Sequence, residues 1–282
     1  SSAGRFQIGE PLGIRAHCKV GGTEIILTKD GWLDISTALS GGRLSEASTY
    51  SDKIISAAKQ AANQYSAFFG WECFYYPAGN LFIANIPRSD FAPIPGSGST
   101  EWAIQSEQHA RNTSTGAWCR FTGWEATTFA VWKDVLYFAS GGQIYVGDIG
   151  TSDDGGPIYI ECIPAFNALN AKGKRKQVTM AAHLTNFPNP EFLVKDGMAD
   201  YNIVFQNQVV DAPFLGGAAW DLVDWDTEYW ATDDEALAET TEGWADTSAF
   251  GYAVTVSLRA RITGYSLKWY GTNYVYRFAG AI

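Results

Sequence analysis

The residues with the greatest capacity for chemistry are concentrated in one acidic, tryptophan-bearing segment near the C-terminal end of the sequence. The segment from Asp221 to Asp246 contains ten Asp or Glu residues and no Lys or Arg. Carboxylates can bind a metal ion or act as an acid–base pair, but the spacing here does not match an EF-hand loop. Tryptophan rings can stack on a sugar or anchor a protein interface. We interpret the segment as a partner-facing or channel-facing loop, with sugar stacking as the alternative, and its candidate residues are Asp221, Asp224, Trp225, Asp226, Trp230 and Trp244.

A second candidate site is a short basic cluster in the middle of the chain. It consists of Lys172, Lys174, Arg175 and Lys176. Such a cluster can contact nucleic-acid phosphates or an acidic partner surface. The pattern favours a solvated turn that leads into a strand, and the phosphate or partner contact is the alternative.

A third candidate is a turn sequence between residues 151 and 159. Ser152, Asp154 and Gly156 fit the Asp-box pattern of sialidase-like propellers, with Tyr159 in place of its tryptophan. In such boxes the polar side chains bond to nearby backbone amides and stabilise a hairpin turn. We expect a plain turn here, and weigh against it a calcium site formed by Asp148, Asp153 and Asp154.

The cysteines and histidines do not form a recognisable catalytic or metal-binding motif. The cysteines are Cys18, Cys73, Cys119 and Cys162, with no CxxC spacing among them. We expect four buried, reduced thiols, with two disulfides as the alternative. The histidines are His17, His109 and His183. No nucleophile elbow, zinc-protease, phosphate-loop or dinucleotide motif is present. We therefore predict no catalytic residue, no cofactor and no metal site, with a Ser/His/Asp site assembled from residues far apart in the chain as the alternative.

The composition bounds the class of protein. The 282 residues include 11 Trp, 14 Tyr, 16 Phe and 29 Gly, a mixture typical of β-rich chains with many turns. No apolar run is long enough for a membrane span, and the first residues lack the features of a signal peptide. The net charge is −10, which argues against general nucleic-acid binding. Outside 221–246, however, acidic and basic residues balance at 20 each, so that argument applies mainly to the acidic segment.

The elements that must position these residues are mostly short strands. Gly21-Gly22 and Gly141-Gly142 are hairpin signals between apolar runs. One helix is predicted over about 46–69, with Ser45 as N-cap and an apolar stripe at intervals of three and four residues. Residues 117–147 read as four strands of one propeller blade or one sandwich sheet.

The predicted fold is mainly β, in two domains. Weak repeats with a period of about 50 to 60 residues favour a propeller-like meander over 1–156, which contains the helix and is too short for a complete propeller. Residues 157–282 read as an antiparallel β-sandwich-like domain with an acidic, Trp-rich insertion at 220–246. Strands are predicted there at 157–163, 174–184, 200–209, 252–262 and 265–278.

Several stretches resemble a known family. These stretches resemble the tail hub or nozzle proteins of short-tailed bacteriophages, of the tail tubular protein B and packaged-DNA-stabilisation type: 17–39, 112–129, Leu136-Tyr-Phe, 146–150, 153–158, the Trp/Asp segment, 251–254 and 276–282. The resemblance covers most of the chain as patterns. Members of that family are usually longer, so it implies that this chain corresponds to a C-terminal part or a short version.

The resemblance implies a virion structural protein and not an enzyme. Such a protein forms a ring, expected to be a homohexamer, that extends the DNA channel and helps to retain and eject the genome. Its expected partners are copies of itself, portal-adaptor and tail fibre or spike proteins, and double-stranded DNA in non-specific passage. It is expected in the phage tail after assembly in the host cytoplasm. The alternative is a carbohydrate-binding or sialidase-like, glycan-active β-propeller, and a further one is a cell-surface adhesion module.

Overall fold

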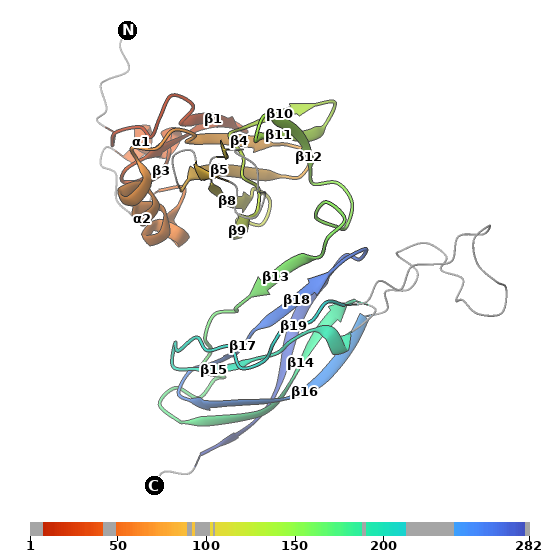
Figure 1. The fold of residues 1–282 in the computed structure, drawn as a ribbon. Helices are drawn as coiled ribbons and strands as arrows, with labels where there is room; N and C mark the ends of the chain where they lie inside the picture. Colours follow the sequence, from red (N-terminus) through yellow and green to blue (C-terminus); the bar gives the residue numbers. More distant parts are fainter. Residues whose placement is uncertain are drawn as a thin grey trace, which may run out of the picture. The chain divides into compact units, whose positions relative to one another are not determined.

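The computed structural model describes residues 8–41, 49–88, 92–93, 102–103, 105–187, 190–212 and 240–279. Antiparallel sheets dominate these residues, so the predicted mainly-β class is confirmed. The chain forms two compact units, unit 1 (Ser1–Ile149) and unit 2 (Gly150–Ile282), whereas the sequence placed the boundary at 156/157 (Figure 1). Within the described residues, neither helix has the length and apolar character of a membrane span.

Unit 1 begins with a three-stranded meander. Strands β1 (His17–Val20), β2 (Thr23–Thr28) and β3 (Gly31–Asp34) pair in that order. The first turn requires a residue with positive φ, and Gly21 supplies it at +60°. The second turn is closed by the Thr28 hydroxyl, which donates to the Gly31 carbonyl oxygen at 2.7 Å. A short helix, α1 (Ile35–Gly41), follows β3.

A four-stranded meander follows in the order β4-β5-β8-β9. Its strands are β4 (Glu72–Tyr76), β5 (Leu81–Pro87), β8 (Ser106–Asn112) and β9 (Trp118–Thr122). A small hairpin of β6 (Ala92–Pro93) and β7 (Trp102–Ala103) lies between β5 and β8 in the sequence.

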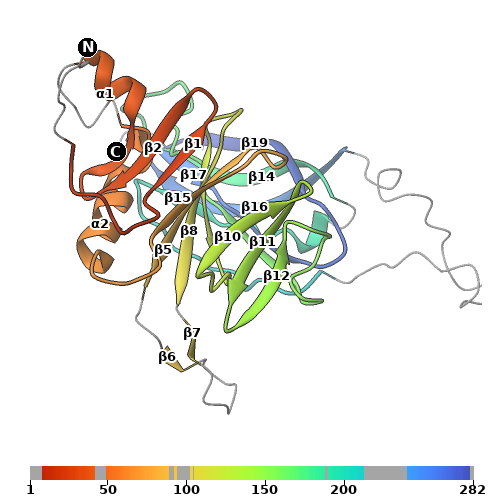
Figure 2. The ribbon, with the colours of Figure 1, turned by 90° about the horizontal axis from the view of Figure 1, so that it is seen from above.

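A third meander contains β10 (Thr128–Trp132), β11 (Val135–Ser140) and β12 (Gln143–Gly147) (Figure 2). The prediction that 117–147 forms one four-stranded sheet is therefore wrong. The reason is that the tight turn at 113–116 folds β9 back onto β8, and Gly123, with a φ of +94°, then turns the chain away.

The predicted helix is present but shorter than 46–69. A 3-10 turn, η2 (Asp52–Ile54), leads into α2 (Ile55–Tyr65), and Ser45 lies outside the described residues. Ala58 and Ala61 are buried on α2, as the apolar stripe predicted, and Ala62 is buried beside them. The helix ends before Phe68 because the chain tightens into a turn, with Phe68 N–H donating to the Tyr65 carbonyl oxygen.

Two apolar clusters form the core of unit 1. The first lies between α2 and the first two meanders and includes Trp32, Trp71 and Phe82. The second lies between the second and third meanders and includes Ile83, Phe129 and Leu136. Burial of these aromatic and aliphatic side chains stabilises unit 1.

An ion pair connects the segment before β1 with the second and third meanders. The Arg15 guanidinium lies 3.4 Å from the Glu72 carboxylate and also donates to the Thr127 carbonyl oxygen at 2.8 Å. Glu72 in turn accepts from the Phe129 backbone N–H at 3.2 Å. Burial raises the pKa of Glu72, and the nearby Arg15 opposes this shift.

Unit 2 is built around one long central strand. Strand β14 (Lys176–Asn186) lies between β16 (Thr240–Gly251) and β19 (Lys268–Phe278) (Figure 1). The register of β14 against β19 shifts between Val178 and Met180, which leaves Thr179 as an extra residue.

Two smaller pairs complete unit 2. Strand β13 (Ile158–Cys162) pairs with β18 (Leu258–Ile262), and β15 (Gly197–Ala199) pairs with β17 (Val254–Val256). A 3-10 turn, η3 (Pro190–Phe192), lies between β14 and β15 in the sequence. The predicted strand at 200–209 is wrong, because the backbone there bonds to a buried carboxylate instead of to a neighbouring strand.

Candidate functional site

Most of the acidic, tryptophan-bearing segment lies outside the described residues. This applies to Asp221, Asp224, Trp225, Asp226 and Trp230. Trp244 is described: it lies on β16 opposite Ala182 of β14 and is 46% exposed. An exposed indole on a strand is available for contact, and the interface role of Trp244 and of the rest of the segment stays a prediction.

The basic cluster divides into an exposed part and a buried part. Lys172, Lys174 and Arg175 are exposed, whereas Lys176 is fully buried at the start of β14. The Lys176 ammonium donates to the carbonyl oxygens of Ala171, Lys174 and Tyr252 at 2.7–2.8 Å. All three of its protons are thereby used. Lys176 therefore stabilises the local backbone, and the predicted basic contact is limited to the other three residues.

Two of the exposed basic residues, Lys174 and Arg175, lie on aromatic rings at the C-terminal ends of β16 and β19. The Arg175 guanidinium lies 5.2 Å from the ring centre of Tyr252 and 5.6 Å from that of Phe250. The Lys174 ammonium lies 5.4 Å from the ring centre of Phe278. These rings are themselves exposed. We call this group, Lys174, Arg175, Phe250, Tyr252 and Phe278, the basic–aromatic surface.

The basic–aromatic surface is assembled by strand register. Lys176 lies opposite both Gly251 of β16 and Phe278 of β19, so three separate parts of the sequence meet at one end of the sheet. Cations stacked on exposed aromatic rings are enriched at protein interfaces. The sequence pointed to the basic residues, but their aromatic partners depend on pairings between residues far apart in the chain.

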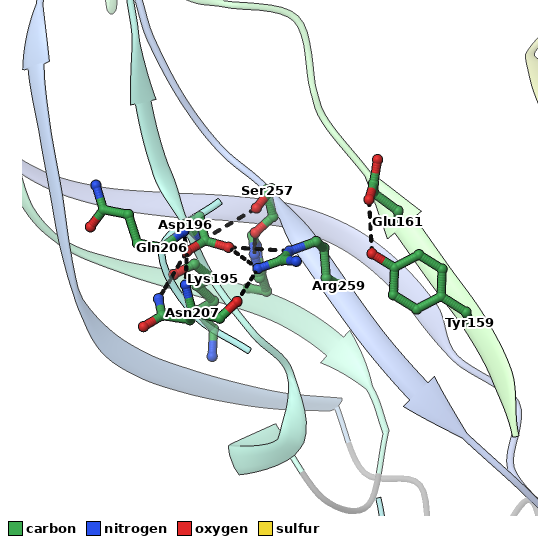
Figure 3. A network of polar contacts seen from close by, with 9 residues as sticks. Tyr159, Glu161, Lys195, Asp196, Gln206, Asn207, Ser257 and Arg259 are labelled. Atoms are coloured by element: carbon green, nitrogen blue, oxygen red, sulfur yellow. Dashed lines mark hydrogen bonds and ion pairs between the residues drawn. The ribbon is translucent and has the colours of Figure 1, made fainter. Parts of the chain in front are cut away.

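A buried polar network in unit 2 is centred on Asp196 (Figure 3). One carboxylate oxygen accepts from the backbone N–H groups of Gln206 and Asn207, each at 3.0 Å. The other oxygen accepts from Arg259 of β18, with 2.6 Å to Nη2. Arg259 also lies 4.1 Å from the ring centre of Phe205. The network fixes the segment around 205–207 against β18. The spacing of these residues in the sequence did not predict that they would form a network.

Lys195, the neighbour of Asp196, lines a pocket of about 350 Å³. Its side chain is buried, and burial lowers its pKa. Its ammonium makes a long hydrogen bond, 3.4 Å, to the Leu193 carbonyl oxygen. The lining is otherwise rich in amides and hydroxyls, including Gln177, Thr179, Gln206 and Asn207. Such a pocket can accept a small polar molecule.

The Asp-box-like sequence forms the expected turn. Asp153 and Gly156 exchange backbone hydrogen bonds of 3.0 and 2.8 Å, and Asp154 and Gly155 have φ values of +47° and +80°. Two central residues with positive φ are typical of a tight hairpin turn. Within the described residues, no three His, Cys, Asp or Glu side chains lie close enough together to hold a metal ion.

The cysteines differ from the prediction in their burial. All four are thiols in the structure, but only Cys73 is buried; Cys18 is half-buried, and Cys119 and Cys162 are exposed. Contact with the Cys18 thiol, together with burial, raises the pKa of Cys73. The burial of each cysteine depends on where its strand lies. Cys73 lies in the core of unit 1, whereas Cys162 lies on the two-stranded β13–β18 pair.

The third meander presents apolar residues on both of its faces. Its inner face, with Phe129, Leu136 and Phe138, contacts the core of unit 1. The register places the alternate residues on the opposite face, because Ala130 pairs with Tyr137 and Tyr137 pairs with Val146. We call this the apolar outer face: Ala130, Trp132, Tyr137, Ala139, Ile144 and Val146.

The apolar outer face is strongly exposed. Trp132, at the end of the edge strand β10, is 62% exposed, and Ile144, on the opposite edge strand β12, is 77% exposed. A contiguous apolar surface of this kind marks an interaction site. The sequence carried a signal for it, since the runs 129–132, 135–139 and 144–146 lack the polar alternation of a half-buried sheet.

Comparison with protein-family models and with curated proteins finds no match for this chain.

Proposed function

We propose that this chain is a virion structural protein of the phage tail hub or nozzle type, which acts by assembling with copies of itself and not by catalysis. The observation that carries the proposal is the apolar outer face of the third meander, which exposes Trp132 and Ile144. Burying such a surface between subunits is favourable by roughly 25 cal/mol per Å² of apolar area.

A ring is the assembly that fits these surfaces best. The apolar outer face and the basic–aromatic surface lie on different units and differ in chemistry. Contacts between unlike surfaces of identical chains are head-to-tail, and they close into a ring when the rotation permits. We propose a homohexamer that extends the DNA channel, contacts portal-adaptor and tail fibre or spike proteins, and helps to retain and eject double-stranded DNA.

The finer architecture belongs to the same proposal. The three antiparallel meanders of unit 1 are the kind of element from which propeller blades are built. We propose that they form a propeller-like part and that unit 2 is sandwich-like. The acidic segment would face the channel, where carboxylates repel DNA phosphates and allow the duplex to slide. Localisation in the virion, after assembly in the host cytoplasm, follows from this role.

Native mass spectrometry and negative-stain imaging of the purified chain test the proposal. We expect a ring of six copies of the 30.8 kDa chain, with a central opening. A chain that stays monomeric across the micromolar range, or that forms only open fibres, would contradict it.

The alternative is a glycan-binding protein, which the amide- and hydroxyl-lined pocket beside Lys195 favours. Its side chains offer both donors and acceptors, as sugar hydroxyls require. Binding of a glycan library by the monomer, lost on Asn207→Ala and retained on Asn273→Ala, would support this alternative over the ring.

A further inference from the structure

Unit 1 contains a second pocket, which lies between α2 and one face of strands β8 and β9. Alternate residues of β8 point to the same side of the sheet, so Glu107 and His109 share a face. His109 pairs with Arg120 of β9, and Arg111 pairs with Trp118, which places Arg120 and Trp118 on that same face. Helix α2 covers it with Gln60, Gln64 and Tyr65.

The pocket has a volume of about 360 Å³ and a mixed polar lining. Its charged residues are Arg88, Glu107 and Arg120. They carry one negative and two positive charges, so the pocket has a net positive charge before His109 is considered. The volume is sufficient for a small polar ligand.

The one carboxylate in the pocket already has partners. The Glu107 side chain lies 3.5 Å from the Arg88 guanidinium and 3.7 Å from His109 Nε2. The hydrogen bond with His109, and the charge of Arg88, lower the pKa of Glu107. Glu107 therefore already faces two donors, and it is not the group that would receive a donor from a ligand.

The donors of the pocket, in contrast, are not all used. His109 is 6% exposed, and its Nδ1 has no hydrogen-bond partner among the described residues; with Nε2–H facing Glu107, this Nδ1 is an acceptor in the neutral ring and is not counted among the donors. Nε1 of Trp118, an atom that can only donate, likewise has no hydrogen-bond partner within the described residues. Arg120 is exposed and has no ion pair closer than 4.0 Å within the described part of the chain. A buried donor without a partner, such as the Trp118 indole N–H, is rare and costly, which indicates that a ligand supplies its acceptor.

We propose that this pocket binds an oxyanion, that is, the carboxylate or phosphoryl group of a small ligand. An oxyanion offers only acceptors, and a guanidinium with an indole N–H is a donor set that suits it. Arg120 supplies the charge, the Trp118 indole N–H and the Gln64 amide supply directed hydrogen bonds, and Glu107 holds Arg88 and His109 in position. The site is independent of the proposed assembly role.

The test uses the indole N–H signal of Trp118 in the full chain labelled with ¹⁵N-tryptophan. That signal is assigned by its loss in Trp118→Phe. The chain is titrated with sodium phosphate and, separately, with sodium acetate, and sodium chloride at the same ionic strength is the baseline. We expect a saturable shift of the Trp118 signal. A shift with phosphate alone identifies a phosphoryl site, and a shift with acetate as well identifies a carboxylate site.

Two arginine variants decide whether the pocket is responsible. Arg120→Gln is expected to weaken binding about tenfold or more, the size of one charge-assisted hydrogen bond. Arg277→Gln, which changes an exposed arginine on β19 bonded to Gln177, is the matched control and should leave binding unchanged. The proposal is overturned if neither oxyanion shifts the Trp118 signal beyond chloride, or if the two variants weaken binding equally.

Discussion

The Arg259 guanidinium and the Asp196 carboxylate form a buried ion pair in unit 2, with 2.6 Å between Nη2 and Oδ2 and side chains only 8% and 0% exposed. Both partners of the pair make further hydrogen bonds. Arg259 also donates to the Asn207 carbonyl oxygen, and Asp196 also accepts from the backbone N–H groups of Gln206 and Asn207. Removing one partner of such a pair leaves an uncompensated buried charge, which is more costly than the pair itself is stabilising.

Asp196→Asn is therefore expected to destabilise unit 2 by about 3–5 kcal/mol. Urea unfolding followed by circular dichroism measures the change. The matched control is Asp211→Asn, which breaks the exposed pair with Arg261 and should cost under about 1 kcal/mol. Equal effects of the two variants would show that burial of the Asp196 pair has no energetic consequence.

His183 is expected to make folding stability depend on pH. Burial, opposed by the hydrogen bond to the Ser257 carbonyl oxygen, lowers its pKa from 6.5 to about 4. Between these values the unfolded chain binds a proton that the folded chain does not, so stability falls as the pH drops from 6.5 towards 4. The loss is about 3 kcal/mol when complete.

Unfolding midpoints measured at pH 7 and pH 4.5 check this expectation. His183→Gln should reduce the difference between the two midpoints relative to the wild-type chain. His17→Gln removes an exposed histidine that bonds to Glu24, and it should leave the difference unchanged. If His183→Gln shows the same midpoint difference as the wild-type chain, the pH dependence comes from other groups.

Lys176 is expected to be more important for stability than its neighbour Lys174. Lys176→Met keeps the length of the side chain but leaves three carbonyl oxygens without their donor. The expected cost is about 2–4 kcal/mol, whereas Lys174→Met, on the surface, should cost under about 1 kcal/mol. Thermal unfolding of both variants measures this, and a smaller effect at Lys176 than at Lys174 would refute the buried role.

The apolar outer face is expected to be required for assembly but not for folding. Ile144→Lys with Val146→Lys places two charges on the exposed side of β12 and should abolish the ring while leaving the circular dichroism spectrum unchanged. Ile14→Lys, a matched change at an exposed residue outside the strands, should leave the ring intact. Rings that persist in the β12 variant would exclude this face as the subunit contact.

Local signals explain what could be predicted from the sequence. The Gly21-Gly22 and Gly141-Gly142 pairs lie at hairpin turns as expected, because only a few residue types tolerate positive φ. The apolar stripe of α2 likewise identified its buried face. These features depend on neighbours in the chain, so the pattern of residue types is sufficient to find them.

The parts that could not be predicted depend on contacts between distant residues. Asp196 and Arg259 are separated by 63 positions, and neither stands out from other charged residues in the sequence. Lys176 looked like part of a solvated cluster because its burial is set by β16 and β19, which pair with it from 75 or more positions away. The oxyanion pocket likewise needs α2, β8 and β9 together.

The extra residue in β14 has a consequence for how its side chains are distributed. Lys176 and Val178 are buried at even positions before Thr179, and Ala181, His183 and Thr185 are buried at odd positions after it, where the small Ala182 is buried as well. The buried side chains of β14 therefore fall on even positions before Thr179 and mainly on odd positions after it. The register shift at Thr179 causes this change. A regular strand would have to turn either the Lys176 ammonium or the His183 ring to the other side of the sheet. Thr179 is the residue that allows one strand to bury both.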